Sequence, residues 1–316
     1  MSKDKILKIF SVICLFSAFC SFGLSQNKNQ KEKVRTVTIP ISIYGNKEKK
    51  EQQTEEFIEA GDIIVKEDGD EQQILSIRSV SNTPLSLAVL IQDDLTSNAN
   101  LQLKSIADFI KQLPKGSRVM VGYLRGGNLQ IRQKFTDDLE KAAKSLRIIV
   151  GRGAASGDPY SAVDDALRRF DALPSGRRAV LLVSDGLDVS NGTDFASTIQ
   201  SIELDRAILK AQRKSIAVYS FYNAATFTES GNSILVSSGQ GSLNRLSEET
   251  GGRAFFQGTI SPISFEPFFK DLTNALNRQF ALTYLSTHMK KGYHKVQVLS
   301  TNEEVKIEHP KGYYYR

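Results

Sequence analysis

Residues 85–94 read LSLAVLIQDD, an apolar run that stops at one polar amide and two carboxylates. Near-continuous apolar runs are typical of parallel strands that are covered on both faces. Further apolar residues then recur at helical spacing until Pro114 and Gly116 end the pattern. The stretch therefore predicts a buried parallel strand that ends in an acidic turn and leads into a helix. The apolar residues of that helix are Leu101, Ile106, Phe109, Ile110 and Leu113.

Strand and helix patterns alternate through the rest of residues 84–279. Such alternation predicts an α/β fold with a doubly wound, mostly parallel sheet flanked by helices. Ligands of such sheets bind outside the carboxyl ends of the strands, where Asp93, Asp94 and Asp185 are expected. The expected strands cover 118–124, 179–183 and 216–221, and the expected helices cover 139–149, 163–170, 202–212, 243–250 and 265–278.

The segments on either side of this region have the pattern of antiparallel strands. Val37, Ile39 and Ile41 alternate with polar or small residues, which is the period of a half-buried strand. Residues 280–316 contain further strand patterns without helices between them. Each segment supplies too few strands to be stable alone. We therefore expect residues 35–80 and 280–316 to form one small accessory β unit.

The first 25 residues have the pattern of a secretory signal peptide. Three lysines precede an apolar run at 9–23, and small residues stand before a possible cleavage point after Ser25. The alternative is an uncleaved anchor, although the run is shorter than the ~20 residues that span a membrane. Residues 26–34 are polar and predict a flexible linker. We expect an exported protein, periplasmic or secreted, that meets the membrane only during export.

Composition and charge exclude several classes of function. The chain has 316 residues, of which 40% are hydrophobic and 24% are charged. This composition is that of an ordinary globular protein. The formal charge of +6 is partly N-terminal, and the basic stretch 26–35 lacks the aromatic residues that stack on bases. We expect no nucleic-acid partner. Both cysteines, Cys14 and Cys20, lie in the predicted signal peptide, so disulfides and thiol catalysis are not expected in the exported chain.

Motifs that would indicate an enzyme are missing. The chain has no G-x-S-x-G nucleophile elbow, and the glycines at 151–157 fit neither phosphate-binding pattern. Zinc-binding histidines would need closer spacing than His288, His294 and His309 have, so we expect solvated histidines. The sequence predicts a protein without catalytic activity.

Three segments together resemble the von Willebrand factor type A family, most closely its secreted bacterial, Acidobacteria-type members. They are the apolar strand with its acidic turn, LLVSDG at 181–186 and LSEETGGRAFF at 246–256. The resemblance covers nearly all of the expected exported chain. It implies a Rossmann-like, doubly wound sheet and a binding function at the top of that sheet.

The resemblance also implies a metal-ion-dependent adhesion site for Mg²⁺ or Mn²⁺. That site combines an Asp-x-Ser-x-Ser turn, a threonine from a second loop and an aspartate from a third. Asp185 matches the third element. For the first element Asp93 and Asp94 are both available and Ser97 retains a hydroxyl, but Leu95 replaces a serine in the register of Asp93.

The second loop, 151–161, departs further because it contains no threonine. Asp158 and Ser161 supply the best-placed oxygens there, so the implied site is degenerate. The alternative is that its carboxylates are strand-end and helix-cap residues without a bound ion. The candidate metal ligands are Asp93, Asp94, Ser97, Asp158, Ser161 and Asp185.

These observations predict an exported binding or adhesion module. The top of the sheet, at residues 93–98, 151–161 and 185–192, would face a protein or an extracellular polymer. One alternative is a structural component of a cell-envelope complex with a non-functional metal site. Another is a metal-dependent exported hydrolase, which would need a complete ligand set and an organised base.

Overall fold

The computed structural model describes most of the chain after residue 32. The predicted signal peptide at 1–25 lies outside the described residues, as does most of the predicted linker at 26–34. Val34–Arg316 forms one compact unit. No helix among the described residues is both long and apolar enough to cross a membrane. The described residues are 33–45, 62–149, 151, 158–174, 176–190, 192, 201–229 and 231–315.

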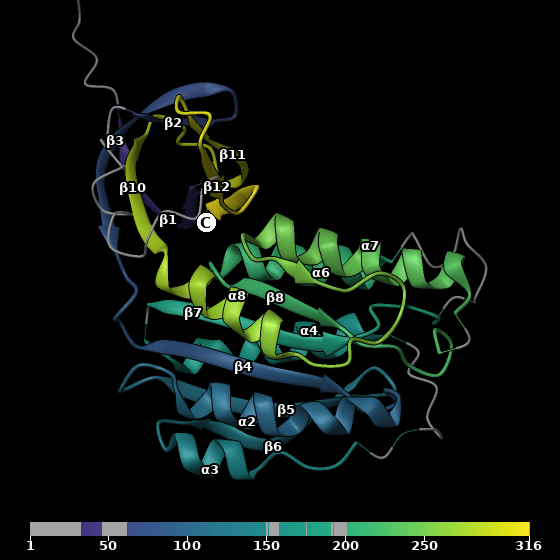
Figure 1. The fold of residues 1–316 in the computed structure, drawn as a ribbon. Helices are drawn as coiled ribbons and strands as arrows, with labels where there is room; N and C mark the ends of the chain where they lie inside the picture. The colour runs from purple at the N-terminus through teal and green to yellow at the C-terminus, as the bar shows by residue number, and fades with distance from the viewer. Residues whose placement is uncertain are drawn as a thin grey trace, which may run out of the picture. The chain divides into compact units, whose positions relative to one another are not determined.

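A six-stranded sheet, here called the main sheet, runs through the centre of the α/β part (Figure 1). Its strand order is β6-β5-β4-β7-β8-β9, and every neighbouring pair is parallel except β5 with β6. The predicted apolar stretch forms β4 in the interior of this sheet. The strands are β4 (Leu85–Gln92), β5 (Arg118–Arg125), β6 (Asn128–Thr136), β7 (Arg177–Ser184), β8 (Ala217–Tyr222) and β9 (Ala254–Phe255).

Helices cover both faces of the main sheet, which explains the apolar character of β4. Side chains of a strand alternate between the two faces, so Leu87 and Val89 join one buried cluster and Ala88 and Leu90 the other. The mixed α/β class predicted from the sequence is confirmed. One face carries η2 (Ser97–Gln102), α2 (Leu103–Lys111), α3 (Leu139–Lys144) and α8 (Glu266–Asn277), and the other carries α4 (Pro159–Arg168), η3 (Arg169–Ala172), α6 (Ile202–Arg213) and α7 (Ser233–Thr250).

A second, curled sheet, here called the accessory sheet, is antiparallel throughout (Figure 1). Its order is β12-β1-β10-β3-β2-β11-β13, so strands from before and after the main sheet interleave. Ile39 of β1 pairs with Leu282 of β10, and both lie in a separate apolar core. The strands are β1 (Arg35–Gly45), β2 (Ile63–Glu67), β3 (Asp70–Ser79), β10 (Gln279–Ser286), β11 (Gly292–Ser300), β12 (Val305–Glu308) and β13 (Gly312–Tyr315).

The expectation that the histidines are solvated is wrong. The His294 side chain is only 4% exposed, and His288 and His309 are half-buried. His294 lies on β11, where its partner Asp68 comes from the turn after β2, more than 220 residues earlier. The sequence around His294 does not indicate burial, because the turn that contacts it is distant in the sequence.

Candidate binding site at the carboxyl edge of the main sheet

The parallel strands β4, β7 and β8 end side by side, and polar residues follow each of them. Asp93 and Asp94 follow β4, Asp185 follows β7, and Asn223 follows β8. All four side chains are buried. This end of the sheet, here called the carboxyl edge, is where doubly wound sheets bind ligands.

Asp185 is enclosed by hydrogen-bond donors and by another carboxylate. Its Oδ1 accepts from the backbone N–H of Leu187 at 3.2 Å, and its Oδ2 accepts from the Thr228 hydroxyl at 3.0 Å. Burial raises the pKa of Asp185 to about 7, and the negative charge of Asp94 adds to this effect. Near neutral pH the side chain is therefore divided between its charged and its protonated form.

Gln92, which the sequence analysis did not select, connects Asp94 and Asp185. Its Oε1 accepts from the Ser184 hydroxyl and, at 3.2 Å, from the backbone N–H of Asp185. Its Nε2 then points the other way and donates to Asp94 Oδ1 at 2.9 Å. Gln92 could have been identified from the sequence, because it is a polar residue at the last position of an apolar strand.

Asp93 forms an ion pair within the chain. Its two oxygens accept from the Arg147 guanidinium at 2.7 and 2.9 Å, and Arg125 lies 3.8 Å away. The Arg147 guanidinium also lies over the Tyr123 ring, 4.0 Å from its centroid. Asp93 is therefore neutralised within the chain.

Asp158 caps helix α4. Its carboxylate accepts from the backbone N–H of Tyr160 at 2.7 Å and from that of Ser161 at 3.0 Å. Burial raises the pKa of Asp158, although these hydrogen bonds oppose the shift, and the charge of Asp188 raises it further. The two predicted hydroxyl ligands, Ser97 and Ser161, belong to exposed residues at the starts of η2 and α4.

Two other residues contribute to the edge without having been predicted. Thr228, in the loop after β8, supplies the hydroxyl that binds Asp185, and a bridge between Leu95 and Ala225 holds this loop against the turn after β4. Leu95 is buried in the core, which gives a packing reason for leucine where the family pattern has serine. Asp188 binds Ser190 through Oδ1, while its buried Oδ2 has no hydrogen-bond partner.

The carboxyl edge does not fit the ion that the family resemblance implies. Mg²⁺ and Mn²⁺ require several oxygen ligands that converge on one point. Asp93 is bound to an arginine, Asp158 is bound to the start of a helix, and Gln92 directs an N–H group at Asp94. Asp185 accepts hydrogen bonds at both oxygens. A hydrogen-bond network thus occupies the predicted site.

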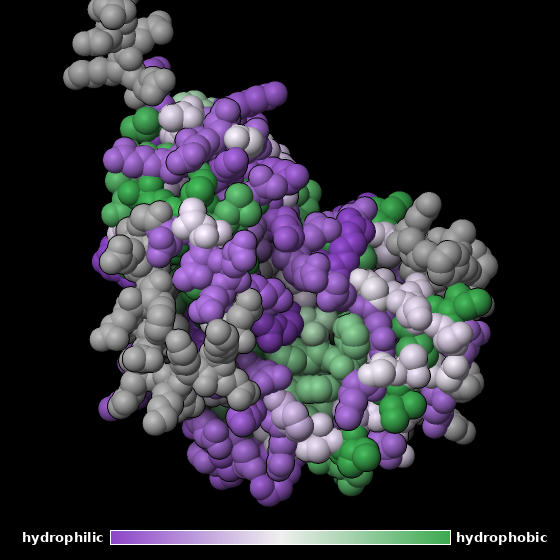
Figure 2. All heavy atoms as spheres, turned by 45° about the horizontal axis from the view of Figure 1, so that its top comes forward, coloured by the Kyte–Doolittle hydropathy of each residue, from purple (hydrophilic) through white to green (hydrophobic). Residues whose placement is uncertain are grey.

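Large apolar side chains surround this polar centre on the outside. Six of them, here called the apolar rim, are from 54% exposed at Ile234 to 89% exposed at Ile263. They come from η2, from the chain after α3, from the first turns of α6 and α7, and from the loop between β9 and α8. Figure 2 shows hydrophobic side chains on the side toward which β4 and β8 point in Figure 1. The rim comprises Leu101, Ile148, Ile202, Ile234, Ile260 and Ile263.

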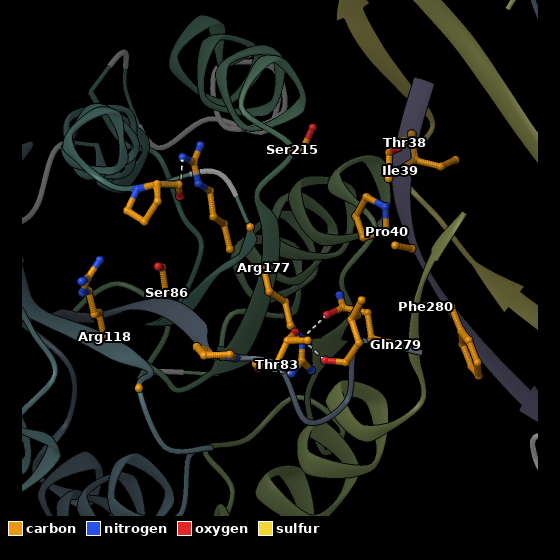
Figure 3. Close-up of a pocket in the computed structure, with 17 residues that line it drawn as sticks. Thr38, Ile39, Pro40, Thr83, Ser86, Arg118, Arg177, Ser215, Gln279 and Phe280 are labelled. Carbon is orange, nitrogen blue, oxygen red and sulfur yellow. Dashed lines mark hydrogen bonds between the residues drawn. The ribbon is translucent and has the colours of Figure 1, made fainter. Parts of the chain in front are cut away.

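A cavity of about 700 Å³ lies at the other end of the strands, between the main sheet and β1 and β10 (Figure 3). The half-buried Arg177 is one of the arginines that line it. The Arg177 guanidinium donates to Gln279 Oε1 at 2.6 Å and to Ser81 O at 3.0 Å, and it also binds the carbonyl of Leu276. Burial lowers the pKa of Arg177. Since these contacts join the main sheet to β10, we assign this arginine a structural role.

Comparisons with known proteins give neighbours in structure only. No family model and no curated protein matches the sequence. Similar solved structures include an aerotolerance-related membrane protein from Bacteroides fragilis (11% identity, TM-score 0.43, 61% of this chain and 98% of that chain). Another is a von Willebrand factor type A protein from Catenulispora acidiphila (10%, 0.43, 77% and 74%). A third is the von Willebrand factor domain of a type V pili tip protein from Porphyromonas gingivalis (11%, 0.41, 64% and 96%). The second and third of these neighbours carry the name of the family that the sequence resembles.

Proposed function

We propose that this chain is an exported, non-catalytic binding module that docks a protein partner on the carboxyl edge of the main sheet. The observation that carries the proposal is the apolar rim, six exposed large aliphatic side chains gathered around one edge. Single exposed aliphatic residues are common, but clusters bordered by polar groups mark interaction surfaces.

The loop that bears Ile263 is held rigidly, which favours binding. The buried side chain of Gln102 donates to the carbonyl of Ile263 at 2.9 Å and accepts from the backbone N–H of Phe265 at 2.8 Å. The backbone is therefore fixed while the Ile263 side chain faces solvent. An anchor that is ordered before binding loses little conformational entropy on binding.

The charges at the edge define the complementary partner. Asp93 is neutralised by Arg147, whereas Asp94, Asp158 and Asp188 are further buried carboxyl groups at this edge. A protein surface with aliphatic side chains around a lysine or arginine would match this arrangement. Electrostatic complementarity of this kind chiefly gives specificity and fast association.

A metal-dependent hydrolase is the rival function, and the described geometry disfavours it. Metal-assisted hydrolysis needs an ion that activates water and a base within reach of it. Here Asp158 and Asp185 accept hydrogen bonds from the backbone, and Gln92 presents N–H to Asp94. Reproducible turnover that depends on Mg²⁺ or Mn²⁺ would overturn the proposal.

The test compares matched surface variants in affinity capture from the native source. Ile260→Glu and Ile263→Glu change the apolar rim, and Leu299→Glu changes a residue of the accessory sheet that is 46% exposed. We expect wild type and Leu299→Glu to retain the same partner and both rim variants to lose it, with unchanged melting temperatures. Retention by the rim variants would place the interface elsewhere. Loss with Leu299→Glu alone would move it to the accessory sheet.

A further inference from the structure

A cluster of metal-ligating side chains lies in the accessory sheet, away from the carboxyl edge. Asp68 stands in the turn between β2 and β3, His288 follows β10, and His294 lies on β11. One ligand atom from each of the three lies within 4.8 Å of the other two. We propose that Asp68, His288 and His294 form a binding site for a divalent transition metal, with Zn²⁺ the best match.

The hydrogen bonds of His294 fix which ring nitrogen faces the cluster. Its Nε2 lies 2.7 Å from the carbonyl of Lys290, which only accepts, so Nε2 carries the proton. Nδ1 faces Asp68 Oδ2 at 2.8 Å and Glu67 Oε1 at 3.3 Å. In the neutral ring this nitrogen has a lone pair directed at two carboxylates, an arrangement that a bound cation stabilises.

The surroundings orient the ligands as metal sites require. The backbone N–H of Lys295 donates to Asp68 Oδ1 at 2.8 Å, which leaves Oδ2 for the ion. The carbonyl of Lys290 holds the His294 ring in place in the same way. Such second-layer hydrogen bonds fix the tautomer and the direction of ligands, and removing them typically weakens metal affinity by about 10–100-fold.

Glu67 lies beside the cluster, with Oε1 3.3 Å from His294 Nδ1. Its side chain is 0% exposed, and Oε1 accepts from Ser286, Tyr313 and Arg35. Its other oxygen, Oε2, is buried without any hydrogen-bond partner. Because Oε1, the oxygen near His294, already accepts three hydrogen bonds and pairs with Arg35, water is the first candidate for the fourth ligand and Glu67 is the alternative.

The ligand types select the metal. Two imidazoles and one or two carboxylates suit Zn²⁺, which prefers four nitrogen, sulfur or oxygen ligands in a tetrahedron. Mg²⁺ and Ca²⁺ prefer oxygen alone. Without an ion, the same geometry is a hydrogen bond between His294 and Asp68 alone, and the experiment separates these two states.

The experiment titrates full-length, tag-free, metal-stripped protein with Zn²⁺ by calorimetry and with Co²⁺ by visible absorption. We expect one saturable site per chain, a d–d spectrum typical of tetrahedral Co²⁺, and a higher melting temperature with Zn²⁺ but not with Mg²⁺. His288→Ala and Asp68→Asn should each weaken binding at least tenfold. His309→Gln removes the third histidine without touching the cluster and should bind as wild type does.

Three outcomes would overturn the proposal. They are the absence of saturable Zn²⁺ binding, equal binding by wild type and the two cluster variants, and loss of binding with His309→Gln alone. Circular dichroism of each variant establishes that it is folded. His288 is half-buried and not part of the core, so we expect His288→Ala to fold. This variant therefore tests the site even if Asp68→Asn fails to fold.

Discussion

Asp185 is a buried carboxyl group at the carboxyl edge, and its burial changes its pKa. A carboxylate placed among Leu187, Thr228 and Asp94 loses its hydration, and the two hydrogen bonds it accepts compensate only in part. The free energy of unfolding therefore depends on whether Asp185 is protonated. The unfolded chain has an Asp pKa of about 3.9, whereas in the folded chain the pKa of Asp185 is about 7.

Asp185→Asn should remove part of the pH dependence of stability. Between about pH 4 and pH 7 the folded protein holds a proton that the unfolded chain has released, so stability falls as the pH rises through this window. Asparagine cannot ionise. We expect the variant to gain about 3 kcal/mol over wild type between about pH 5 and pH 8.

The measurement is urea unfolding of both proteins at several pH values. A constant difference between their free energies of unfolding would contradict the raised pKa of Asp185. Urea unfolding of wild type with added Mg²⁺ or Mn²⁺ tests whether the carboxyl edge binds these ions. We expect the free energy of unfolding to stay unchanged.

Arg147 should contribute more to stability than an exposed arginine does. Its partner Asp93 is 2% exposed, and without Arg147 this buried carboxylate keeps only the more distant and more exposed Arg125 as a counter-ion. We expect Arg147→Ala to cost about 3 kcal/mol. Arg245→Ala breaks pairs with Asp205 and Glu249 at the surface and should cost less than about 1 kcal/mol. Denaturant unfolding measures both, and equal costs would contradict the argument.

At this scale the sequence predicted the acidic turns but not their partners. Asp93, Asp94 and Asp185 were found because strand ends can be located from apolar runs. Thr228 was missed since the loop that carries it reaches Asp185 only through tertiary packing, 43 residues along the chain. Arg147 was missed for the same reason, 54 residues from Asp93.

Helix α7 shows why element boundaries were harder to predict than element types. The sequence predicted a helix at 243–250, whereas α7 begins at Ser233. Its first half is rich in serine and contains Gly239 and Gly241, which are poor helix formers. Gly239 is explained by its neighbour, because a Cβ there would lie 2.1 Å from the carbonyl oxygen of Asp185.

Alanine at these two glycines should therefore have opposite effects. Gly239→Ala forces α7 away from the turn after β7 and should destabilise the protein by about 1–3 kcal/mol. A Cβ at Gly241 meets nothing within 4 Å, so Gly241→Ala should stabilise by about 1 kcal/mol through helix propensity. Thermal melts of the pair provide the comparison. A gain for Gly239→Ala would mean that the close approach of helix and turn is not required.

Strand β6 was not predicted, and its surroundings explain the omission. It lies at the edge of the main sheet, antiparallel to β5, and none of its nine residues is buried. Its partly covered residues, Leu129, Ile131 and Phe135, pack on one face only. Helix α3 likewise ends at Lys144 instead of continuing to 149, since the chain turns there to bring Arg147 to Asp93.

At the scale of the whole molecule, the first and the last described strands, β1 and β13, belong to the same sheet. Alternating apolar residues indicate strands in both segments that flank the α/β part, but neither segment alone determines the strand order. In the structure β10 lies between β1 and β3, so strands of the N-terminal segment pair with a strand of the C-terminal segment. Side-chain contacts that connect this sheet to the α/β part include Arg177 with Gln279 and Arg253 with Glu308.

Truncation after Arg278 should therefore destabilise more than the segment it removes. Deleting 279–316 removes β10, the strand between β1 and β3, and β11, one of the two partners of β2, and it breaks both of those contacts. The exposed edges of β1 and β3 would then pair with other chains. We expect a lower melting temperature and aggregation in size-exclusion chromatography. Truncation after Lys311 removes only the edge strand β13 and is the matched control, with a smaller loss expected. A soluble monomer with an unchanged melting profile after the longer truncation would show that the α/β part is stable without the accessory sheet.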